Sequence, residues 1–261
     1  MRLSISNIGW KQPQDELVYG MMQKYGFSGL EIAPTRIIEQ NPYDQLECAR
    51  AWKEALNKKY AFEVPSMQSI WFGRQENLFQ SEEEKESLIA YTKKAIDFAE
   101  VIECKNLVFG CPRNRNMPEG ASCETAVEFF KELGNYAAER NIVIGMEANP
   151  SIYNTNFIND TKSALALIKE VNSDGFRLNL DVGTMLHNEE IVEQLSGHVH
   201  LISHVHISEP WLKPVREQEV HKKLAQLLVK ENYGNFVSIE MGAQEDLDLL
   251  EACMKYVREI F

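Results

Sequence analysis

Five residues in the second half of the chain have the types and positions expected of metal ligands. Glu147, Asp181 and Glu240 each end a short apolar run, and a further run contains His204 and His206. Three carboxylates held close together repel one another unless a cation neutralises them. Oxygen ligands with one imidazole suit Mn²⁺, Co²⁺ or Mg²⁺ better than they suit a thiol-rich zinc site. We therefore predict a divalent-metal site, for Mn, Co, Mg or Zn, formed by Glu147, Asp181, His206 and Glu240.

The histidines differ in their expected depth. His204 and His206 lie two residues apart, so both face the same side of a strand. His206 is nearer the carboxyl end of the run and is the predicted ligand, whereas His204 is predicted one layer deeper in the core. His198 and His221 are expected on the surface.

Eight short apolar runs must position these groups. They lie at 3–6, 29–33, 61–65, 106–110, 142–147, 176–181, 201–207 and 236–240. Their starts are about 25 to 45 residues apart, which is typical of βαβ units. Eight such units predict an α/β fold, a closed (β/α)₈ TIM barrel, with chemistry at the carboxyl ends of the strands. A doubly wound open sheet is the alternative, but no GxGxxG turn follows the first run.

Helical patterns separate the apolar runs. They lie at 15–25, 43–59, from 81 onward, 124–140, 161–171, 189–195, 216–231 and 245–260. Ser81, with an acidic residue three positions later, predicts a capping box, and Asp160 is a candidate N-cap. No Gly-, Pro- or Ser-rich linker divides the chain, so we expect one TIM-barrel domain over 1–261.

Composition excludes several classes of protein. The 261 residues carry 39 Asp+Glu and 27 Lys+Arg, a net charge of −12. This charge repels phosphodiester backbones and anionic headgroups, so neither a nucleic acid nor a membrane partner is expected. No run approaches the roughly 18 apolar residues of a membrane helix, and a signal-peptide core is missing. The five scattered cysteines indicate reduced thiols and a cytoplasmic location.

Longer motifs surround the predicted ligands. They are GLEIAPTR at 29–36, GMEANP at 145–150, LDVGTM at 180–185, HVHISE at 204–209 and SIEMG at 238–242. These motifs resemble the xylose isomerase-like TIM-barrel superfamily, the sugar phosphate isomerase/epimerase group, over nearly the whole chain. The resemblance implies the same four metal ligands, with Glu147 and Glu240 as the acid/base pair. The group that the chain resembles includes ketose 3-epimerases, hydroxypyruvate isomerases and inosose dehydratases.

Two positions depart from the pattern of this family. Many relatives have Asp-x-x-His on the sixth strand, but Thr184 stands where that histidine would be, and His187 follows three residues later. Ketose 3-epimerases have a second glutamate six residues after the fifth-strand glutamate, and here that position is Tyr153. Both departures weaken any transfer of sugar specificity.

The predicted function is a divalent-metal-dependent sugar isomerase or epimerase. A proton would leave a carbon next to the carbonyl of a keto-sugar or polyol, and the cation would stabilise the resulting enediolate. Glu147 and Glu240 would remove and return the proton from opposite faces.

Other polar and aromatic residues are candidates for binding the substrate or lining the mouth of the site. The substrate candidates are Trp10, Glu31, Gln68, Trp71, Asn149, Thr184, His187 and Glu209. Glu31 is alternatively a salt-bridge partner of Arg36. Arg113 and Arg115 form a small basic cluster, which is either a solvated loop or a docking point for an anion.

Several alternatives stay open. An inosose dehydratase-type lyase or a 1,2-aldose–ketose isomerase would use the same cation and proton abstraction. A sugar-binding relic without turnover is a non-enzymatic alternative, and a nuclease of the endonuclease IV type is disfavoured by the acidic charge. Apolar residues on the outer helices are compatible with a homo-oligomer.

Overall fold

Eight parallel strands form one sheet in the computed structural model, which describes residues 1–261. The strands are β1 (Arg2–Ser6), β2 (Gly29–Glu31), β3 (Ser66–Met67), β4 (Asn106–Phe109), β5 (Val143–Glu147), β6 (Phe176–Asp181), β7 (Ile202–Ile207) and β8 (Phe236–Ile239). Their order is β2-β1-β8-β7-β6-β5-β4-β3. Isolated bridges from Gly29 to Glu63 and from Ile32 to Met67 join the two edges and nearly close the ring. The predicted TIM barrel is therefore confirmed, and the open doubly wound sheet is excluded.

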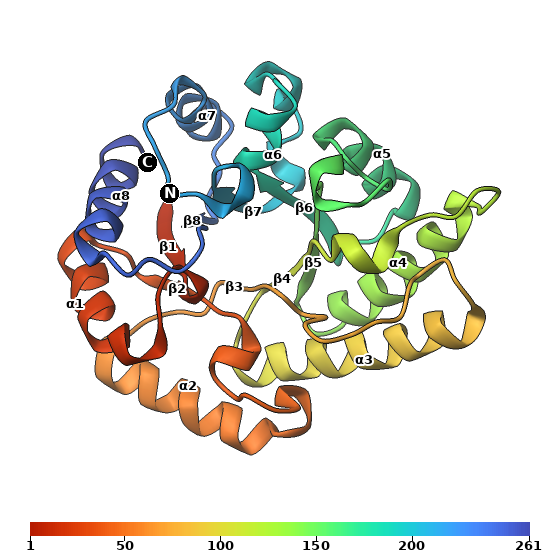
Figure 1. Ribbon diagram of the computed structural model, residues 1–261, viewed down its shortest axis with the longest axis horizontal. Coiled ribbons are helices and arrows are strands. Elements are labelled where there is room, and N and C mark those ends of the chain that lie inside the picture. The colour runs from red at the N-terminus through yellow and green to blue at the C-terminus, as the bar shows by residue number, and fades with distance from the viewer.

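One α-helix follows each strand, and together the helices surround the barrel (Figure 1). They are α1 (Asp15–Tyr25), α2 (Leu46–Tyr60), α3 (Glu82–Val101), α4 (Cys123–Ala138), α5 (Thr161–Val171), α6 (Val182–His187), α7 (Glu219–Lys230) and α8 (Leu247–Ile260). Their apolar faces pack on the outer surface of the strands, where one continuous cluster of buried side chains forms the core. None of these helices combines the length and the apolar character needed to cross a membrane.

Polar side chains begin two of these helices as predicted. Oγ of Ser81 accepts the amide of Glu84 at 3.2 Å, and Asp160 accepts the amide of Ser163 at 2.7 Å. The box at Asp160 is complete, but the carboxylate of Glu84 accepts instead from the amide of Asn77.

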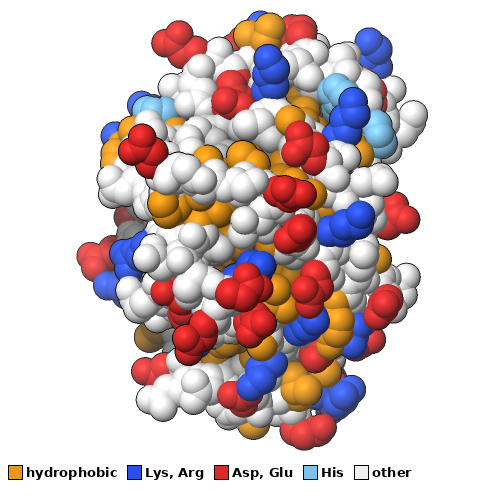
Figure 2. Space-filling model, turned by 90° about the vertical axis from the view of Figure 1, so that its right-hand side faces the viewer, with side chains coloured by type: hydrophobic (Ala, Val, Ile, Leu, Met, Phe, Trp, Pro, Cys, Tyr) orange, Lys and Arg blue, Asp and Glu red, His pale blue; other side chains and the backbone are white.

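On the face shown in Figure 2, acidic and basic side chains are interspersed.

Two elements differ from the sequence prediction. The third strand is shifted from 61–65 to Ser66–Met67, because Pro65 has no N–H with which to pair in the sheet. The helix predicted at 189–195 is wrong. The chain turns into α6 directly after β6, since the side chain of Asp181 caps this helix, and Glu189 interrupts any continuation with a φ of 55°.

The inside of the barrel is polar. Asn106 on β4 donates to Oγ of Ser66 at 3.0 Å and accepts from Oγ of Ser203 on β7 at 2.8 Å. Strands β4 and β7 are not neighbours in the sheet, so these groups meet across the interior. Gly145 on β5 leaves the space for them, because a Cβ there would lie 2.7 Å from Oδ1 of Asn106 and 3.0 Å from Cβ of Asn179. This layer supports the side chains above it.

Candidate metal centre

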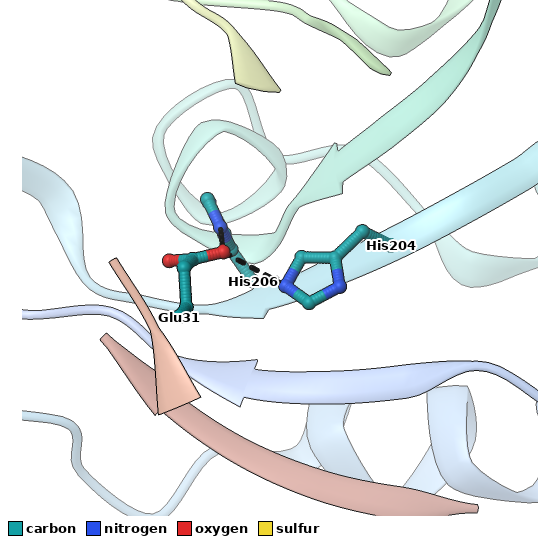
Figure 3. A group of neighbouring side chains, drawn as sticks. All are labelled: Glu31, His204 and His206. Carbon is teal, nitrogen blue, oxygen red and sulfur yellow. Dashed lines mark hydrogen bonds and ion pairs between the residues drawn. The ribbon is translucent and has the colours of Figure 1, made fainter. Parts of the chain in front are cut away.

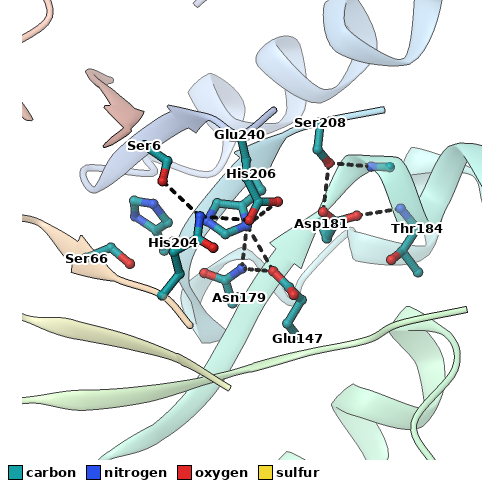
Figure 4. A network of polar contacts seen from close by, with 12 residues as sticks. Ser6, Ser66, Glu147, Asn179, Asp181, Thr184, His204, His206, Ser208 and Glu240 are labelled. Atoms are coloured by element: carbon teal, nitrogen blue, oxygen red, sulfur yellow. Dashed lines mark hydrogen bonds and ion pairs between the residues drawn. The ribbon is translucent and has the colours of Figure 1, made fainter. Parts of the chain in front are cut away.

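The structure brings the four predicted ligands together at the carboxyl ends of the strands (Figure 4). Glu147 and Asp181 are the last residues of β5 and β6, His206 lies one residue before the end of β7, and Glu240 follows β8. Asp181 and His206 are paired in the register of β6 and β7. One ligand atom from each residue lies within 4.8 Å of the others, so the four side chains converge on one point.

His206 lies at the centre of this cluster, in contact with three carboxylates. Its Nδ1 lies 2.9 Å from Oε1 of Glu147 and 3.3 Å from Oε2 of Glu240, and its Nε2 lies 2.9 Å from Oε2 of Glu31. Burial lowers the pKa of this imidazole, but the surrounding carboxylates outweigh burial and raise the pKa of His206 well above its ordinary value. Without a metal, the imidazole is therefore the cation that these carboxylates share.

Glu147 is held by two amides. Oε1 accepts from Nδ2 of Asn179 at 2.8 Å, and Oε2 accepts from Nδ2 of Asn149 at 3.2 Å. Arg115 orients Asn149 by donating to its Oδ1 at 2.7 Å, and it also donates to the carbonyl of Glu147 at 3.0 Å. Arg115 is fully buried, which excludes the solvated-loop interpretation for this residue, and burial lowers the pKa of its guanidinium to about 10.

Burial and neighbouring carboxylates raise the pKa of Asp181 and of Glu240. Burial, with the charges of Glu147 and Glu240, raises the pKa of Asp181 to about 7, although Ser208 donates to its Oδ2 at 2.7 Å. Burial likewise raises the pKa of Glu240, which accepts from Nε2 of Gln68 at 2.9 Å. A divalent cation among these oxygens would replace repulsion by attraction. Three carboxylates and one imidazole therefore fit a hard divalent metal such as Mn²⁺ or Mg²⁺.

A cavity of about 140 Å³ lies over the cluster. Its lining consists of Pro112, Glu147, Asn149, Tyr153, Asp181, Ser208, Glu209, Leu212 and Glu240. Four of these side chains are acidic and none is Lys or Arg, so the cavity offers hydrogen-bond acceptors and no cationic group. A larger cavity, about 460 Å³, is lined by residues that include Arg2, Asn106, Val143 and Phe236 at the amino ends of the strands, away from these carboxylates.

The predicted substrate-binding residues fall into two groups. Asn149 and Glu209 line the cavity. The others do not line it. Glu31 and Gln68 lie buried within the barrel, and Trp10 and Trp71 are buried with their indoles donating to Asp15 and Thr92. Thr184 donates to the carbonyl of Ala148, and His187 is exposed at the end of α6. The structure also places Arg36 against Asp15 at 3.1 Å rather than against Glu31.

Tyr153 and Trp211 meet at the mouth of the cavity. The amide of Trp211 donates to the hydroxyl of Tyr153 at 2.7 Å, and the two rings pack edge to face at 5.4 Å. Trp211 has a φ of 65°, and 58 % of its surface is exposed. The position where relatives are expected to have a glutamate thus holds an aromatic ring that fixes the loop after β7.

Three residues that contact the cluster, Asn179, Ser208 and Arg115, were not predicted in these roles from the sequence. Asn179 lies two residues before Asp181, so the two-residue period of a strand places it on the same inner face, one layer lower. Arg115 was noticed only as part of a small basic cluster, because the contacts with β5 that bury it cannot be read from the sequence.

Comparison with known proteins agrees with the TIM-barrel fold of this chain. The profile of the family described as xylose isomerase-like TIM barrel matches residues 21–259. A D-psicose 3-epimerase from Clostridium cellulolyticum H10, solved with D-tagatose, has 15 % identity and a TM-score of 0.79, with 100 % of this chain and 99 % of that chain covered. A 3-keto-D-glucoside 4-epimerase from E. coli has 18 % identity and a TM-score of 0.76, with 99 % of each chain covered.

A third solved structure carries a different activity in its name. A probable 3-DHS dehydratase from Bacillus anthracis has 17 % identity and a TM-score of 0.71, with 98 % of each chain covered. No curated protein sequence matches the chain. At these identities the solved structures establish the fold alone, whereas the family profile covers most of the chain. The chain therefore belongs to the xylose isomerase-like TIM barrel family.

Proposed function

We propose that the protein is a divalent-metal-dependent isomerase or epimerase that moves a proton next to the carbonyl of an uncharged keto-sugar or polyol. The observation that carries this proposal is the convergence of Glu147 and Glu240 on His206 from strands that are not neighbours in the sheet. A substrate over the cluster would have one of these glutamates on each side. Epimerases and a dehydratase among the solved structures of this fold support the same class of chemistry.

The two glutamates have the environment of an acid/base pair. Glu240 has one oxygen hydrogen-bonded to Gln68 and the other only at 3.3 Å from His206, so this second oxygen can take up a proton. Burial raises the pKa of Glu240, which suits a group that takes and returns a proton near neutral pH. Glu147 is fixed by Asn179 and Asn149, so its direction is set before substrate binds.

Glu147, Asp181, His206 and Glu240 would hold the metal. When bound, a divalent cation supplies positive charge for the oxygen on which negative charge develops as the proton leaves carbon. Asn149 and Glu209, both on the cavity wall, would orient hydroxyl groups. The absence of Lys and Arg from the lining favours an uncharged sugar over a sugar phosphate.

Isotope exchange tests the proposal directly. The purified protein is incubated with Mn²⁺ and a panel of unphosphorylated ketoses in D₂O, and the products are followed by NMR. An epimerase places deuterium on the inverted carbon, and Glu147→Gln and Glu240→Gln each lower the rate by about 10²-fold or more. Glu259→Gln, on the exposed face of α8, is the matched control and keeps the wild-type rate.

Other results decide against the proposal. Full activity in both active-site variants would contradict the acid/base assignment. Release of water without an inverted product would identify a dehydratase on the same barrel. A protein that binds no divalent metal and exchanges no deuterium would be a relic.

A further inference from the structure

Glu31 is a buried carboxylate without any Lys or Arg partner. It is the last residue of β2, and its side chain is fully buried below the metal cluster. Its Oε1 lies 3.3 Å from Nε2 of Gln68, and its Oε2 lies 2.9 Å from Nε2 of both His204 and His206 (Figure 3). A buried carboxylate needs partners that donate hydrogen bonds. The amide of Gln68 is one such donor, and each histidine nitrogen is another when it carries the ring proton.

The two ring nitrogens of His206 face different carboxylates on opposite sides of the ring. Nδ1 points to Glu147 and Glu240 in the cluster, and Nε2 lies 2.9 Å from Oε2 of Glu31. An imidazole can bind a metal only through a nitrogen that carries no proton. Carboxylates flank both nitrogens, and a cation in the cluster would displace the proton from Nδ1 alone. Glu31 then keeps the remaining proton on Nε2, since two acceptors facing each other would repel.

We propose that Glu31 is the positioning residue of the metal centre, which accepts Nε2–H of His206 and so fixes both the tautomer and the ring orientation that direct Nδ1 at the cation. This inference rests on the proposed function, because it requires the four-residue cluster to hold a metal. A histidine ligand held through its other ring nitrogen by a carboxylate binds metal more tightly than one that is free to turn.

The position of Glu31 argues against its being a ligand or a substrate contact. The ring of His206 stands between Glu31 and the carboxylates of the cluster, as the opposite directions of its two nitrogens require. Glu31 is not part of the cavity lining and has no exposed surface. It therefore acts on the site only through the residues that it contacts.

His204 supports Glu31 from below. Its Nε2 lies 2.9 Å from the same oxygen, although it has no well-aligned hydrogen-bond acceptor, and its ring meets that of His206 edge to face at 5.3 Å. Gln68 links the same carboxylate to the cluster, because its Nε2 also donates to Oε1 of Glu240 at 2.9 Å. Besides its direct contact with His206, Glu31 thus reaches the predicted metal ligands through His204 and Gln68.

Metal affinity and the histidine tautomer test this assignment. Titration calorimetry measures binding of Mn²⁺ and Zn²⁺ to the wild type, to Glu31→Gln and to Glu190→Gln. Glu190 is a partly buried glutamate hydrogen-bonded to Gln194 and Asn188, away from both histidines, and its variant is the control. We expect Glu31→Gln to raise Kd by about 10- to 100-fold, because a glutamine must turn its NH₂ toward one of three N–H groups.

Nitrogen-15 NMR of the zinc-loaded wild type shows directly which ring nitrogen of His206 carries the proton. We expect the proton of His206 on Nε2, and we expect Glu31→Gln to shift or broaden this signal while the Glu190→Gln spectrum is unchanged. A proton on Nδ1, or an unchanged Kd in Glu31→Gln, would overturn the role of Glu31 alone. A second metal equivalent that disappears in Glu31→Gln would overturn it too, since Glu31 would then be a ligand. A wild type that binds no metal would overturn the proposed function as well.

Discussion

Gly110 lies directly against the carboxylate of Glu147. A Cβ at Gly110 would stand 2.7 Å from Oε2 of Glu147 and 3.5 Å from Oδ1 of Asn149. The nearest atom belongs to the end of a flexible side chain, so an added methyl group would displace the carboxylate rather than the backbone. The position of the Glu147 carboxylate therefore depends on a glycine that follows the neighbouring strand β4.

Gly110→Ala is expected to damage the site and spare the fold. We expect the free energy of unfolding without metal to change by less than about 1 kcal/mol, while Mn²⁺ affinity falls on the order of tenfold or more. Chemical denaturation and calorimetry measure the two quantities. Gly9→Ala is the control, because a Cβ there meets its nearest atom at 3.7 Å. Wild-type metal affinity in Gly110→Ala would show that Glu147 is not a ligand.

Much of this architecture could be predicted from local patterns. The four candidate ligand positions follow from apolar runs that end in Glu147, Asp181 and Glu240 or contain His206. These runs can be recognised without knowledge of any long-range contact. The burial of Arg115 could not be predicted in this way, because its partners come from β5 and the loop after it, more than 30 residues away. Tertiary contacts also decide which face of α7 is covered.

His221 shows this last limit. It was expected on the surface, but it is completely buried on α7, with Nδ1 3.0 Å from the hydroxyl of Tyr256. The amphipathic face of a helix is visible in the sequence, but the partner that covers it comes from α8, whose position is set by closure of the barrel. The surface prediction for His221 is therefore wrong.

The free energy of unfolding is expected to depend on His221 below neutral pH. Burial lowers the pKa of His221 to about 4, although Glu209 acts in the opposite direction. The unfolded chain, with an imidazole pKa near 6.5, binds the proton more readily, so stability is present above pH 6.5 and is lost as the pH falls toward 4. From pH 7.5 to pH 5.0 this group should cost about 2 kcal/mol.

Urea denaturation across this pH range isolates the contribution of His221. His221→Gln keeps an acceptor for Tyr256 but does not titrate, so its loss of stability should be smaller than that of the wild type by about 2 kcal/mol. His198→Gln replaces an exposed histidine and should follow the wild-type curve. Parallel curves for wild type and His221→Gln would contradict the prediction.

Asp181→Asn is expected to separate metal binding from stability. The neutral side chain removes one of the carboxylates that repel each other at this cluster, and asparagine is as good an N-cap for α6 as aspartate. We expect the metal-free variant at pH 7.5 to be more stable than the metal-free wild type by on the order of 1 kcal/mol, which raises Tm by a few degrees. Added Mn²⁺ should raise the Tm of the wild type but not that of Asp181→Asn.

Asp160→Asn is the matched control for this experiment. Asp160 caps α5 in the same way, but it belongs to no cluster of carboxylates. Its metal-free Tm and its response to Mn²⁺ should equal those of the wild type. An Asp181→Asn protein that Mn²⁺ stabilises as much as it stabilises the wild type would contradict the assignment of Asp181 as a ligand.

Gly175 sets how closely α4 packs on the barrel. A Cβ at Gly175 would lie 2.0 Å from the carbonyl oxygen of Gly134 and 2.7 Å from the amide nitrogen of Ala138, both backbone atoms of α4. Gly175→Ala must therefore push the helix away, and we expect a loss of on the order of 3 kcal/mol in the free energy of unfolding. Gly234→Ala, in the loop before β8 with no atom within 4 Å, is the control and should unfold like the wild type. Equal stability of the two variants in urea would mean that α4 adjusts without cost, contrary to the tight packing described here.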